Sequence, residues 1–460
     1  MNLRFHNTLT HQKEEFKSIQ DGEVKMYNCG PTVYDYVHVG NLRAFLFADI
    51  LRRTLEYNDF KVKQVMNITD VGHLRSDADE GEDKMTAALK REGKSLNLDS
   101  LKELADFYTT AFLKNLDELN IEKPTLMPKA SENIQEDLQL IERLDQKGFV
   151  YKTSDGLYFD TSKDPNYGRL GGINRDAAED QFRIEQNPEK RHPQDFALWK
   201  FNNDLGWESS YGKGFPGWHI ECSAMSMKYL GETFDIHTGG VDHIPIHHNN
   251  EIAQSEAATG KSLAHYWLHN AFVNVSDGGK MAKSAGNFLK LQDLENEGIS
   301  PLAYRYWLLT SHYRSPVNLN LEALKGSQAA LDRLASHLSS AATGGAINPA
   351  YQQKFHQFIN DDLDTPKALA LVWDLIKDQN VSEADKGATI LDFDRVFGLN
   401  LEKLSEPADF EIPAEISRLA DEREAARQNK DWKKADELRD QIRRLGFEIS
   451  DTESGQKISK

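Results

Sequence analysis

Two cysteines are the scarcest reactive residues of this 460-residue chain, and both stand in stretches that could do chemistry. Cys29 lies in "YNCGPTVYDYVHVGN", where a predicted strand gives way to a turn and then a helix. Cys222 lies in "PGWHIECSAM", 193 residues further along the chain. Because thiolates bind soft metal ions and attack electrophiles, the neighbours of these cysteines decide their chemistry.

A histidine and a glutamate would complete a metal site. In "HIPIHHNNEIAQ", His247 and Glu251 stand four residues apart, on one face of a predicted helix. Two sulfurs, one imidazole and one carboxylate are accepted zinc ligands, and four is the usual tetrahedral number. His248 is an alternative imidazole ligand, since its spacing to Glu251 is also compatible with a helix. The competing interpretation is that both cysteines are small buried hydrophobic residues.

A second group of residues could bind phosphate. His38, Gly40 and Asn41 lie at the start of a predicted helix, whose unpaired N–H groups and positive dipole end attract anions. Lys280 and Lys283 lie in "DGGKMAKSAGNF", a glycine-containing stretch that could close over a triphosphate. Each pattern alone also fits an ordinary turn histidine or two solvated lysines, but together they favour nucleotide chemistry.

The hydrophobic pattern predicts the elements that position these residues. A strand over 23–29, a helix from Asn41 and a strand over 60–70 form a βαβ unit, which starts a parallel sheet. Strand and helix patterns return over 216–275, after an apparent insertion over 149–215 that opens with a predicted hairpin. Further helices are predicted over 98–119, 131–148, 301–310, 321–341, 350–360, 367–378, 383–396, 414–428 and 432–445, with a small terminal strand or hairpin.

Composition narrows the class of protein. Hydrophobic residues make up 39% and charged residues 28%, as in an ordinary globular protein of about three domains. No apolar run is long enough to span a membrane, and the N-terminus lacks the apolar core of a secretory signal. Two cysteines form no disulfide framework, so a reducing cytoplasm is expected. The net charge of −18 argues against a surface that binds polyanions indiscriminately, but allows local patches for a nucleic acid.

Seven ordered motifs carry a resemblance to a known family: "YNCGPTVYDYVHVGNLR", "NITD", "DFALWK", "PGWHIECSAM", "HHNNEIAQ", "KMAKSAGNF" and "HYRSPVN". Together they resemble cysteinyl-tRNA synthetases, with "HVGN" and "KMAKS" in place of the HIGH and KMSKS signatures of class I aminoacyl-tRNA synthetases. The likeness runs from "NTLT" to "ADELRDQIRRLGFEISDTESG", essentially the whole chain. The chain departs from the pattern at Val39, Asn41 and Ala282, in a longer acidic segment over 71–84, and in its "SGQKISK" terminus.

The resemblance implies an α/β fold, with a Rossmann-type parallel-sheet catalytic domain interrupted by an insertion. A helical bundle and a small C-terminal anticodon-binding domain would follow. The implied divisions are 1–125 and 215–300 for the two catalytic halves, 126–214 for the insertion, 301–404 for the bundle and 405–460 for the anticodon-binding domain.

The resemblance also implies the reaction. It is the ATP-dependent attachment of L-cysteine to tRNA(Cys) through a cysteinyl-adenylate. One zinc ion per chain, held by Cys29, Cys222, His247 and Glu251, would take the substrate thiolate as a further ligand. An ordinary pocket separates near-isosteres by only about 1–3 kcal/mol, whereas zinc prefers sulfur strongly. No editing domain is then expected.

Further roles follow from the resemblance, residue by residue. The catalytic residues would be His38, Asn41, Lys280 and Lys283, and the same four, with Gly40 and Asp242, would bind ATP. The cysteine pocket would be lined by Gly30, Thr32, Thr69, Trp218 and His237. The anticodon would be read by Arg427, Trp432, Asp436 and Asp451. The implied partners are tRNA(Cys), L-cysteine and ATP with Mg²⁺. The protein itself is expected to be a cytoplasmic monomer with no membrane partner.

Three other functions compete with this one. A ligase that transfers activated cysteine to a small amino sugar shares the zinc and ATP sites, but has no use for an anticodon-binding end. A zinc hydrolase could use His247, Glu251 and a metal-bound water, but gives Lys280 and Lys283 no role. A catalytically inactive RNA-binding relative is disfavoured by the intact His38, Asn41 and Lys283.

Overall fold

The structure is a computed structural model of the whole chain. It describes residues 2–71, 84–171, 187–274, 288–340, 344–406, 413–452 and 455–459. Lys280 and Lys283 lie outside the described residues, as does most of the acidic segment that follows "NITD". The chain divides into an N-terminal unit, Met1–Leu401, and a C-terminal unit, Glu402–Lys460, and each is described by itself.

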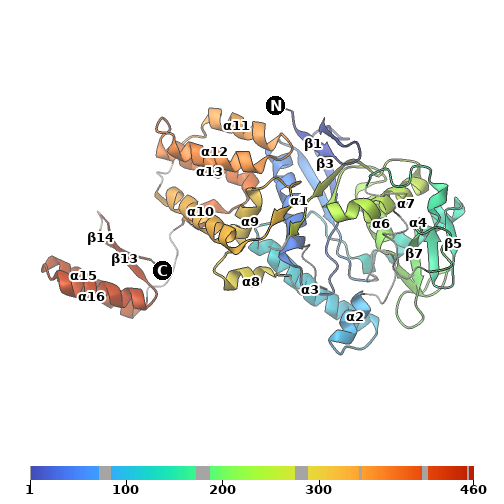
Figure 1. Cartoon of the computed structure of the whole chain (residues 1–460), viewed down its shortest axis with the longest axis horizontal. Helices are drawn as coiled ribbons and strands as arrows, with labels where there is room; N and C mark the ends of the chain where they lie inside the picture. The colour runs from blue at the N-terminus through green and yellow to red at the C-terminus, as the bar shows by residue number, and fades with distance from the viewer. Residues whose placement is uncertain are drawn as a thin grey trace. The chain divides into compact units, whose positions relative to one another are not determined.

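A four-stranded parallel sheet at the centre of the N-terminal unit carries the candidate site (Figure 1). Its strands, in spatial order, are β10 (Ala264–Asn270), β9 (Phe234–Gly240), β3 (Glu23–Asn28) and β4 (Lys61–Met66). The two central strands come from distant parts of the sequence, yet Tyr27 lies opposite His237 in their register. The predicted parallel sheet is confirmed, and its two halves meet between β3 and β9.

Helix α1 (Val39–Tyr57) connects β3 to β4 and completes the predicted βαβ unit. Leu42 and Leu46 recur on its buried face, as the apolar spacing predicted. His38 caps the helix, because its Nδ1 accepts a hydrogen bond from the Asn41 backbone N–H at 3.2 Å. The Asn41 side chain in turn accepts from the His38 backbone N–H, which gives a reciprocal cap. The helix therefore starts two residues before the predicted Asn41.

The insertion is a second, antiparallel sheet in the order β5-β6-β7-β8. Its strands are Val150–Lys152, Gly156–Phe159, Phe196–Phe201 and Gly214–Pro216. The predicted hairpin is confirmed as β5 and β6, with "DG" at its turn. One cluster of buried side chains, which includes Leu144, Trp199 and Ile220, joins this sheet to two helices of the N-terminal unit. Those helices are α4 (Ile134–Gln146) and α6 (Trp218–Leu230).

A group of helices follows the parallel sheet and lies on the side of α1 away from the insertion (Figure 1). They are α9 (Pro301–Leu309), α10 (Leu321–Ser340), α11 (Pro349–Ile359), α12 (Thr365–Lys377) and α13 (Glu383–Phe397). The other elements of the N-terminal unit are β1 (Arg4–Asn7), β2 (Gln12–Glu15), α2 (Lys84–Arg91), α3 (Leu98–Glu118), α7 (Asn249–Thr259), β11 (Val273–Asn274), α8 (Leu291–Asn296) and β12 (Val317–Asn318), and α14 (Leu401–Ser405) follows them.

A buried arginine links α9 to the helices around it. Arg305 of α9 is fully buried and pairs with the equally buried Asp49 of α1. Its other N–H groups donate to the carbonyls of Phe397 at 2.6 Å and Leu119 at 2.9 Å. A Cβ at Gly398, which ends α13 in the left-handed region, would come within 2.3 Å of the guanidinium. Such a buried charge is tolerable because its donors are satisfied, so the site fixes the packing of three helices on one another.

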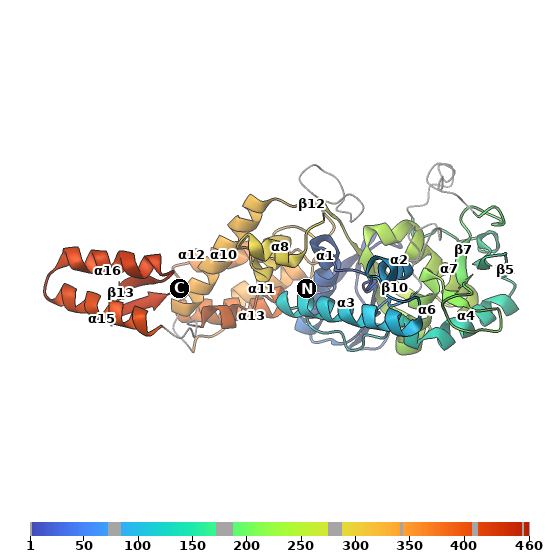
Figure 2. The ribbon, with the colours of Figure 1, turned by 90° about the horizontal axis from the view of Figure 1, so that it is seen from below.

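The C-terminal unit consists of helices α15 (Ala414–Gln428) and α16 (Trp432–Arg444) and a hairpin of β13 (Glu448–Thr452) and β14 (Gly455–Ser459). The two helices run side by side, as Figure 2 shows. Leu419, Leu438 and Ile442 belong to the small core that joins them. Both predicted helices and the terminal hairpin are confirmed. Within the described residues of both units, no helix is at once long and apolar enough to cross a membrane.

Candidate functional site

The carboxyl edge of the parallel sheet gathers the predicted metal ligands. Cys29 directly follows β3, and Cys222 lies on α6, where it is buried. His247 lies in a short π-helical turn, Ile244–His248, and Glu251 lies in the first turn of α7, which continues from it. The packing of α6 against β3 therefore brings together two cysteines that are far apart in the sequence.

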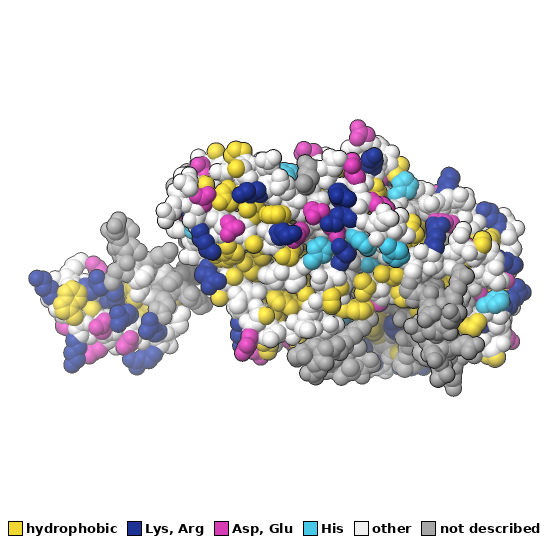
Figure 3. Space-filling model, turned by 45° about the horizontal axis from the view of Figure 1, so that its top comes forward, with side chains coloured by type: hydrophobic (Ala, Val, Ile, Leu, Met, Phe, Trp, Pro, Cys, Tyr) yellow, Lys and Arg dark blue, Asp and Glu magenta, His cyan; other side chains and the backbone are white. Residues whose placement is uncertain are grey.

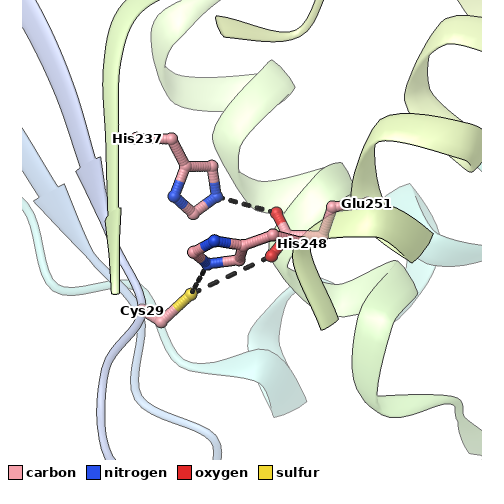
Figure 4. A group of neighbouring side chains, drawn as sticks. All are labelled: Cys29, His237, His248 and Glu251. Carbon is pink, nitrogen blue, oxygen red and sulfur yellow. Dashed lines mark hydrogen bonds and ion pairs between the residues drawn. The ribbon is translucent and has the colours of Figure 1, made fainter. Parts of the chain in front are cut away.

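Two overlapping sets of residues could hold one metal ion. Both contain Cys29 and Glu251, and the ligand atoms of each set lie within 4.8 Å of one another. The first set adds Cys222 and His247, and the second adds His237 and His248. Figure 4 shows the second set, in which Cys29 Sγ lies 3.3 Å from His248 Nε2 and 3.9 Å from Glu251 Oε1. The structure thus brings the predicted His247 and its alternative, His248, to the same carboxylate and thiol.

The first set has the contacts of a site built around a cation. His247 Nε2 lies 2.8 Å from Glu251 Oε1, yet this nitrogen makes no aligned hydrogen bond within the part of the chain that the structure describes. The Trp218 ring stacks on the His247 imidazole at 4.3 Å and fixes its plane. Sulfur, nitrogen and oxygen atoms that converge on one small volume fit a shared positive ion. The donor set, with two sulfurs, one nitrogen and one carboxylate, suits zinc.

The charges around the site favour the anionic forms of the ligands that such an ion needs. A hydrogen bond from the Cys29 thiol lowers the pKa of Cys222 to about 6, whereas burial raises the pKa of Cys29. Burial disfavours the Glu251 carboxylate, but the charges of His237 and His247 outweigh burial and hold its pKa well below the usual range. The site therefore presents a thiolate and a carboxylate side by side.

The surroundings of the two candidate imidazoles differ. Burial opposes the His247 cation, yet the charges of Glu251 and Cys222 raise its pKa to about 10. Burial lowers the pKa of His248 well below its ordinary value, and neighbouring imidazoles lower it further. Positive charge is thus favoured at His247 and disfavoured at His248.

Three further histidines, which the sequence interpretation missed, surround the site. His219 Nδ1 lies 2.9 Å from His247 Nδ1, and His269 Nε2 lies 2.7 Å from His248 Nδ1. The third, His243, packs against the rings of both His247 and His248. A signal existed for His269, which stands near the end of a buried strand as His237 does. Ends of neighbouring parallel strands meet at one edge of a sheet.

The predicted cysteine-pocket residues lie next to this cluster. A Cβ at Gly30 would stand 1.6 Å from the Asn67 carbonyl oxygen, so the crossing of two backbones alone requires glycine there. Thr32 and Thr69 form a parallel bridge, which ties the turn after β3 to the end of β4. His237 Nε2 lies 2.9 Å from Oε2 of Glu251, which is a candidate metal ligand. Trp218 covers His247, as described above. Gly30, Trp218 and His237 therefore adjoin candidate metal ligands, and Thr69 Oγ1 lies 3.4 Å from Glu221, the neighbour of Cys222.

Three of the predicted nucleotide residues, His38, Gly40 and Asn41, lie at the start of α1. Because His38 Nδ1 accepts the Asn41 N–H, the ring proton of a neutral His38 is on Nε2. Leu289, just past the predicted lysine loop, accepts a hydrogen bond from the Val39 N–H at 2.8 Å. The described chain after that loop thus lies against the helix start. Asp242 follows β9 in the turn Val241–His243, at the same edge of the sheet.

The predicted anticodon residues lie in the C-terminal unit. Trp432 begins α16 with 59% of its side chain exposed, and Asp436 lies one turn further on. Arg427 lies in the last turn of α15. Figure 3 shows Lys and Arg side chains interleaved with Asp and Glu side chains on this unit. An exposed indole beside basic side chains can stack on an unpaired base. Asp451 lies in β13, and its side chain is outside the described part.

Comparison with known proteins gives two family matches and a set of relatives. Residues 15–329 match the class I (C) tRNA synthetase catalytic domain, and residues 409–458 match the cysteinyl-tRNA ligase anticodon-binding domain. Cysteine–tRNA ligase 1 of Burkholderia lata is 45% identical and covers 100% of this chain and 97% of its own. Cysteine–tRNA ligase of Treponema denticola is 44% identical, with 98% of each chain covered.

Solved structures share the fold at low sequence identity. A methionyl-tRNA synthetase of Mycobacterium tuberculosis in complex with methionyl-adenylate has a TM-score of 0.55 at 13% identity, covering 84% of this chain and 92% of its own. The LeuRS–tRNA–LeuAMS ternary complex from Agrobacterium radiobacter K84 has a TM-score of 0.57 at 10% identity, covering 86% and 87%. The predicted fold class is thereby confirmed.

Proposed function

The chain belongs to the cysteine–tRNA ligase family of class I tRNA synthetases, and from that premise we propose that it activates L-cysteine with ATP as cysteinyl-adenylate and transfers the cysteinyl group to tRNA(Cys). One observation carries the proposal. Cys29 and Cys222, the only cysteines of the chain, meet His247 and Glu251 with all ligand atoms within 4.8 Å, at the sheet edge where α/β folds bind substrates.

We propose that Cys29, Cys222, His247 and Glu251 hold one zinc ion. When bound, zinc supplies a soft Lewis acid that prefers a thiolate to a hydroxyl. The protein contributes the shape of the pocket around it. Trp218 closes one side by stacking on His247, and the bridge between Thr32 and Thr69 holds the turn after β3, which begins next to Cys29, against the end of β4. The chain therefore selects cysteine by the sulfur atom, which is what distinguishes cysteine from serine.

Activation depends on positioning and on charge neutralisation. The positive dipole end of α1 would attract the phosphates of ATP, and the protonated Nε2 of His38 would donate a hydrogen bond to them. Lys280 and Lys283 would approach from the other side, with Mg²⁺ accompanying ATP. The cysteine carboxylate then attacks the α-phosphorus in line, a P–O bond forms, and pyrophosphate leaves with the electrons of the broken bond. No residue of the chain forms a covalent intermediate.

The C-terminal unit is the proposed reader of the anticodon. Trp432 and Arg427 would stack on unpaired bases, and Asp436 and Asp451 would accept hydrogen bonds from base amino groups. The match of 409–458 to an anticodon-binding family supports this assignment. The divisions 1–125, 126–214, 215–300, 301–404 and 405–460 remain the proposed domain boundaries, with Mg²⁺ and a cytoplasmic location as further parts of the proposal.

Radioactive pyrophosphate exchange and tRNA charging test the function together. We expect the purified chain to exchange pyrophosphate into ATP only with L-cysteine, and to charge tRNA(Cys) with cysteine. Transfer to amino sugars in place of tRNA would instead establish the amino-sugar ligase. A zinc-dependent hydrolytic activity without any exchange would favour the hydrolase, which uses the same ligands. Binding of tRNA with no exchange would mark an inactive relative.

A further inference from the structure

A line of buried hydrogen bonds runs from the first strand of the chain to Cys29. Thr8, just past β1, places its Oγ1 2.8 Å from His269 Nδ1. His269 Nε2 lies 2.7 Å from His248 Nδ1, and His248 Nε2 lies 3.3 Å from Cys29 Sγ. His248 and His269 are at most 3% exposed, and Thr8 is 9% exposed. The zinc-site proposal gives none of Thr8, His248 and His269 a role.

A neutral imidazole has one donor nitrogen and one acceptor nitrogen, so such a line can run in only two directions. In one, the Cys29 thiol donates to His248, and the line ends on the Thr8 oxygen as acceptor. In the other, the Thr8 hydroxyl donates to His269, His269 donates to His248, and His248 Nε2–H donates to the sulfur. A metal-bound cysteine is a thiolate, which has no proton to give. Only the second direction then keeps every buried group paired.

We propose that Thr8 and His269 are positioning residues, which hold His248 in the Nε2–H form so that it donates to the Cys29 thiolate and cannot itself ligate the metal. This inference rests on the proposed function, because it requires Cys29 to be a ligand. The inference also decides between the two overlapping sets of candidate metal ligands. His248 Nε2 with a proton has no lone pair for a metal, so Cys222 and His247 complete the site.

Thr8, at the end of this line of hydrogen bonds, is held in place by its backbone. The Thr8 backbone N–H donates to the Trp267 carbonyl at 2.8 Å, which ties the chain after β1 to β10. The His248 ring packs against Trp267 and His269, at 5.1 Å and 4.9 Å between ring centres. The rings therefore have little freedom to turn. The Cys29 thiolate, which can only accept, sets the direction, and the Thr8 hydroxyl ends the line as the donor to His269. Partners of this kind, beyond the ligands, typically change metal affinity by about 10–100-fold.

Substitution of Thr8 provides a matched test. Thr8→Val keeps the shape but removes the hydroxyl, and Thr8→Ser keeps the hydroxyl. We expect Thr8→Val to weaken zinc binding about tenfold or more, measured by chelator competition, and Thr8→Ser to bind zinc like the native chain. Equal affinity of Thr8→Val and the native chain would overturn the proposal. Equal losses in both variants would also overturn it, since packing rather than the hydroxyl would then matter.

A second measurement uses the native chain and does not depend on how a variant folds. The ¹⁵N chemical shifts of histidine rings in the zinc-loaded native chain report which nitrogen carries the proton. We expect a protonated Nε2 on His248, and an unprotonated Nε2 on this residue would overturn the proposal. A native chain that binds no zinc, or Cys222→Ser that binds it normally, would instead overturn the zinc site itself. A failure of the proposed line of hydrogen bonds and a failure of the proposed function would therefore give different results.

Discussion

Cys222→Ser is expected to lose both its zinc and its preference for cysteine over serine. A serine hydroxyl remains protonated at neutral pH and replaces a soft thiolate by a hard, weak ligand, so the site loses one of its four donors. The zinc content should fall from about one per chain to a small fraction. The ratio of cysteine to serine in pyrophosphate exchange should fall to the roughly 10–200-fold that a pocket without a metal achieves.

A matched control lies one turn along the same helix. Ser226 is as buried as Cys222 and donates to the Ser223 carbonyl at 3.0 Å, away from the ligand atoms. Ser226→Ala should therefore keep the zinc and the selectivity, with at most a small loss of stability. If Cys222→Ser kept full zinc content and full selectivity, the sulfur of Cys222 would have no part in the site, and the proposed zinc site would be wrong.

His38→Asn should lower the rate of cysteine-dependent pyrophosphate exchange by about 10²–10³-fold, the usual effect of removing one donor to a transition state. The loss should appear in kcat more than in the KM for cysteine, because His38 lies at the start of α1 and outside both sets of candidate metal ligands. Asparagine is a favourable N-cap residue, so α1 should keep its cap in this variant. Zinc content should stay at the native value.

His38→Ala separates catalysis from capping. Alanine removes both the ring donor and the cap, so this variant should lose the same activity as His38→Asn and about 1 kcal/mol of stability in addition. Thermal unfolding compares the two variants directly. If His38→Asn exchanged pyrophosphate at the native rate, His38 would be a capping residue only, and the donors to phosphate would have to be sought elsewhere.

Periodic patterns explain why so much of the fold could be predicted. Leu42 and Leu46 recur at helical spacing because one face of α1 is buried, and the strand at Lys61–Met66 follows at once. Local spacing also predicted His247 and Glu251 as partners, since both lie on one continuous turn and helix. These features depend on neighbours within a few residues, and a sequence displays such neighbours directly.

Other features depend on neighbours that the sequence does not reveal. The choice between His247 and His248 could not be predicted, because the π-helical turn that carries them brings both rings to Glu251. His269 and Thr8 were missed, since their contacts join strands and turns far apart in the chain. The close approach of Gly30 to the Asn67 carbonyl was also not predicted, because it joins the turn after β3 to the residue after β4.

X-ray absorption at the zinc edge of the native chain tests the central claim most directly. The account predicts about one zinc per chain with two sulfur neighbours, from Cys29 and Cys222, and nitrogen or oxygen neighbours from His247 and Glu251. Addition of L-cysteine should raise the sulfur count by one, and addition of L-serine should leave it unchanged. A native chain without zinc, or a zinc ion with a single sulfur neighbour, would contradict the account.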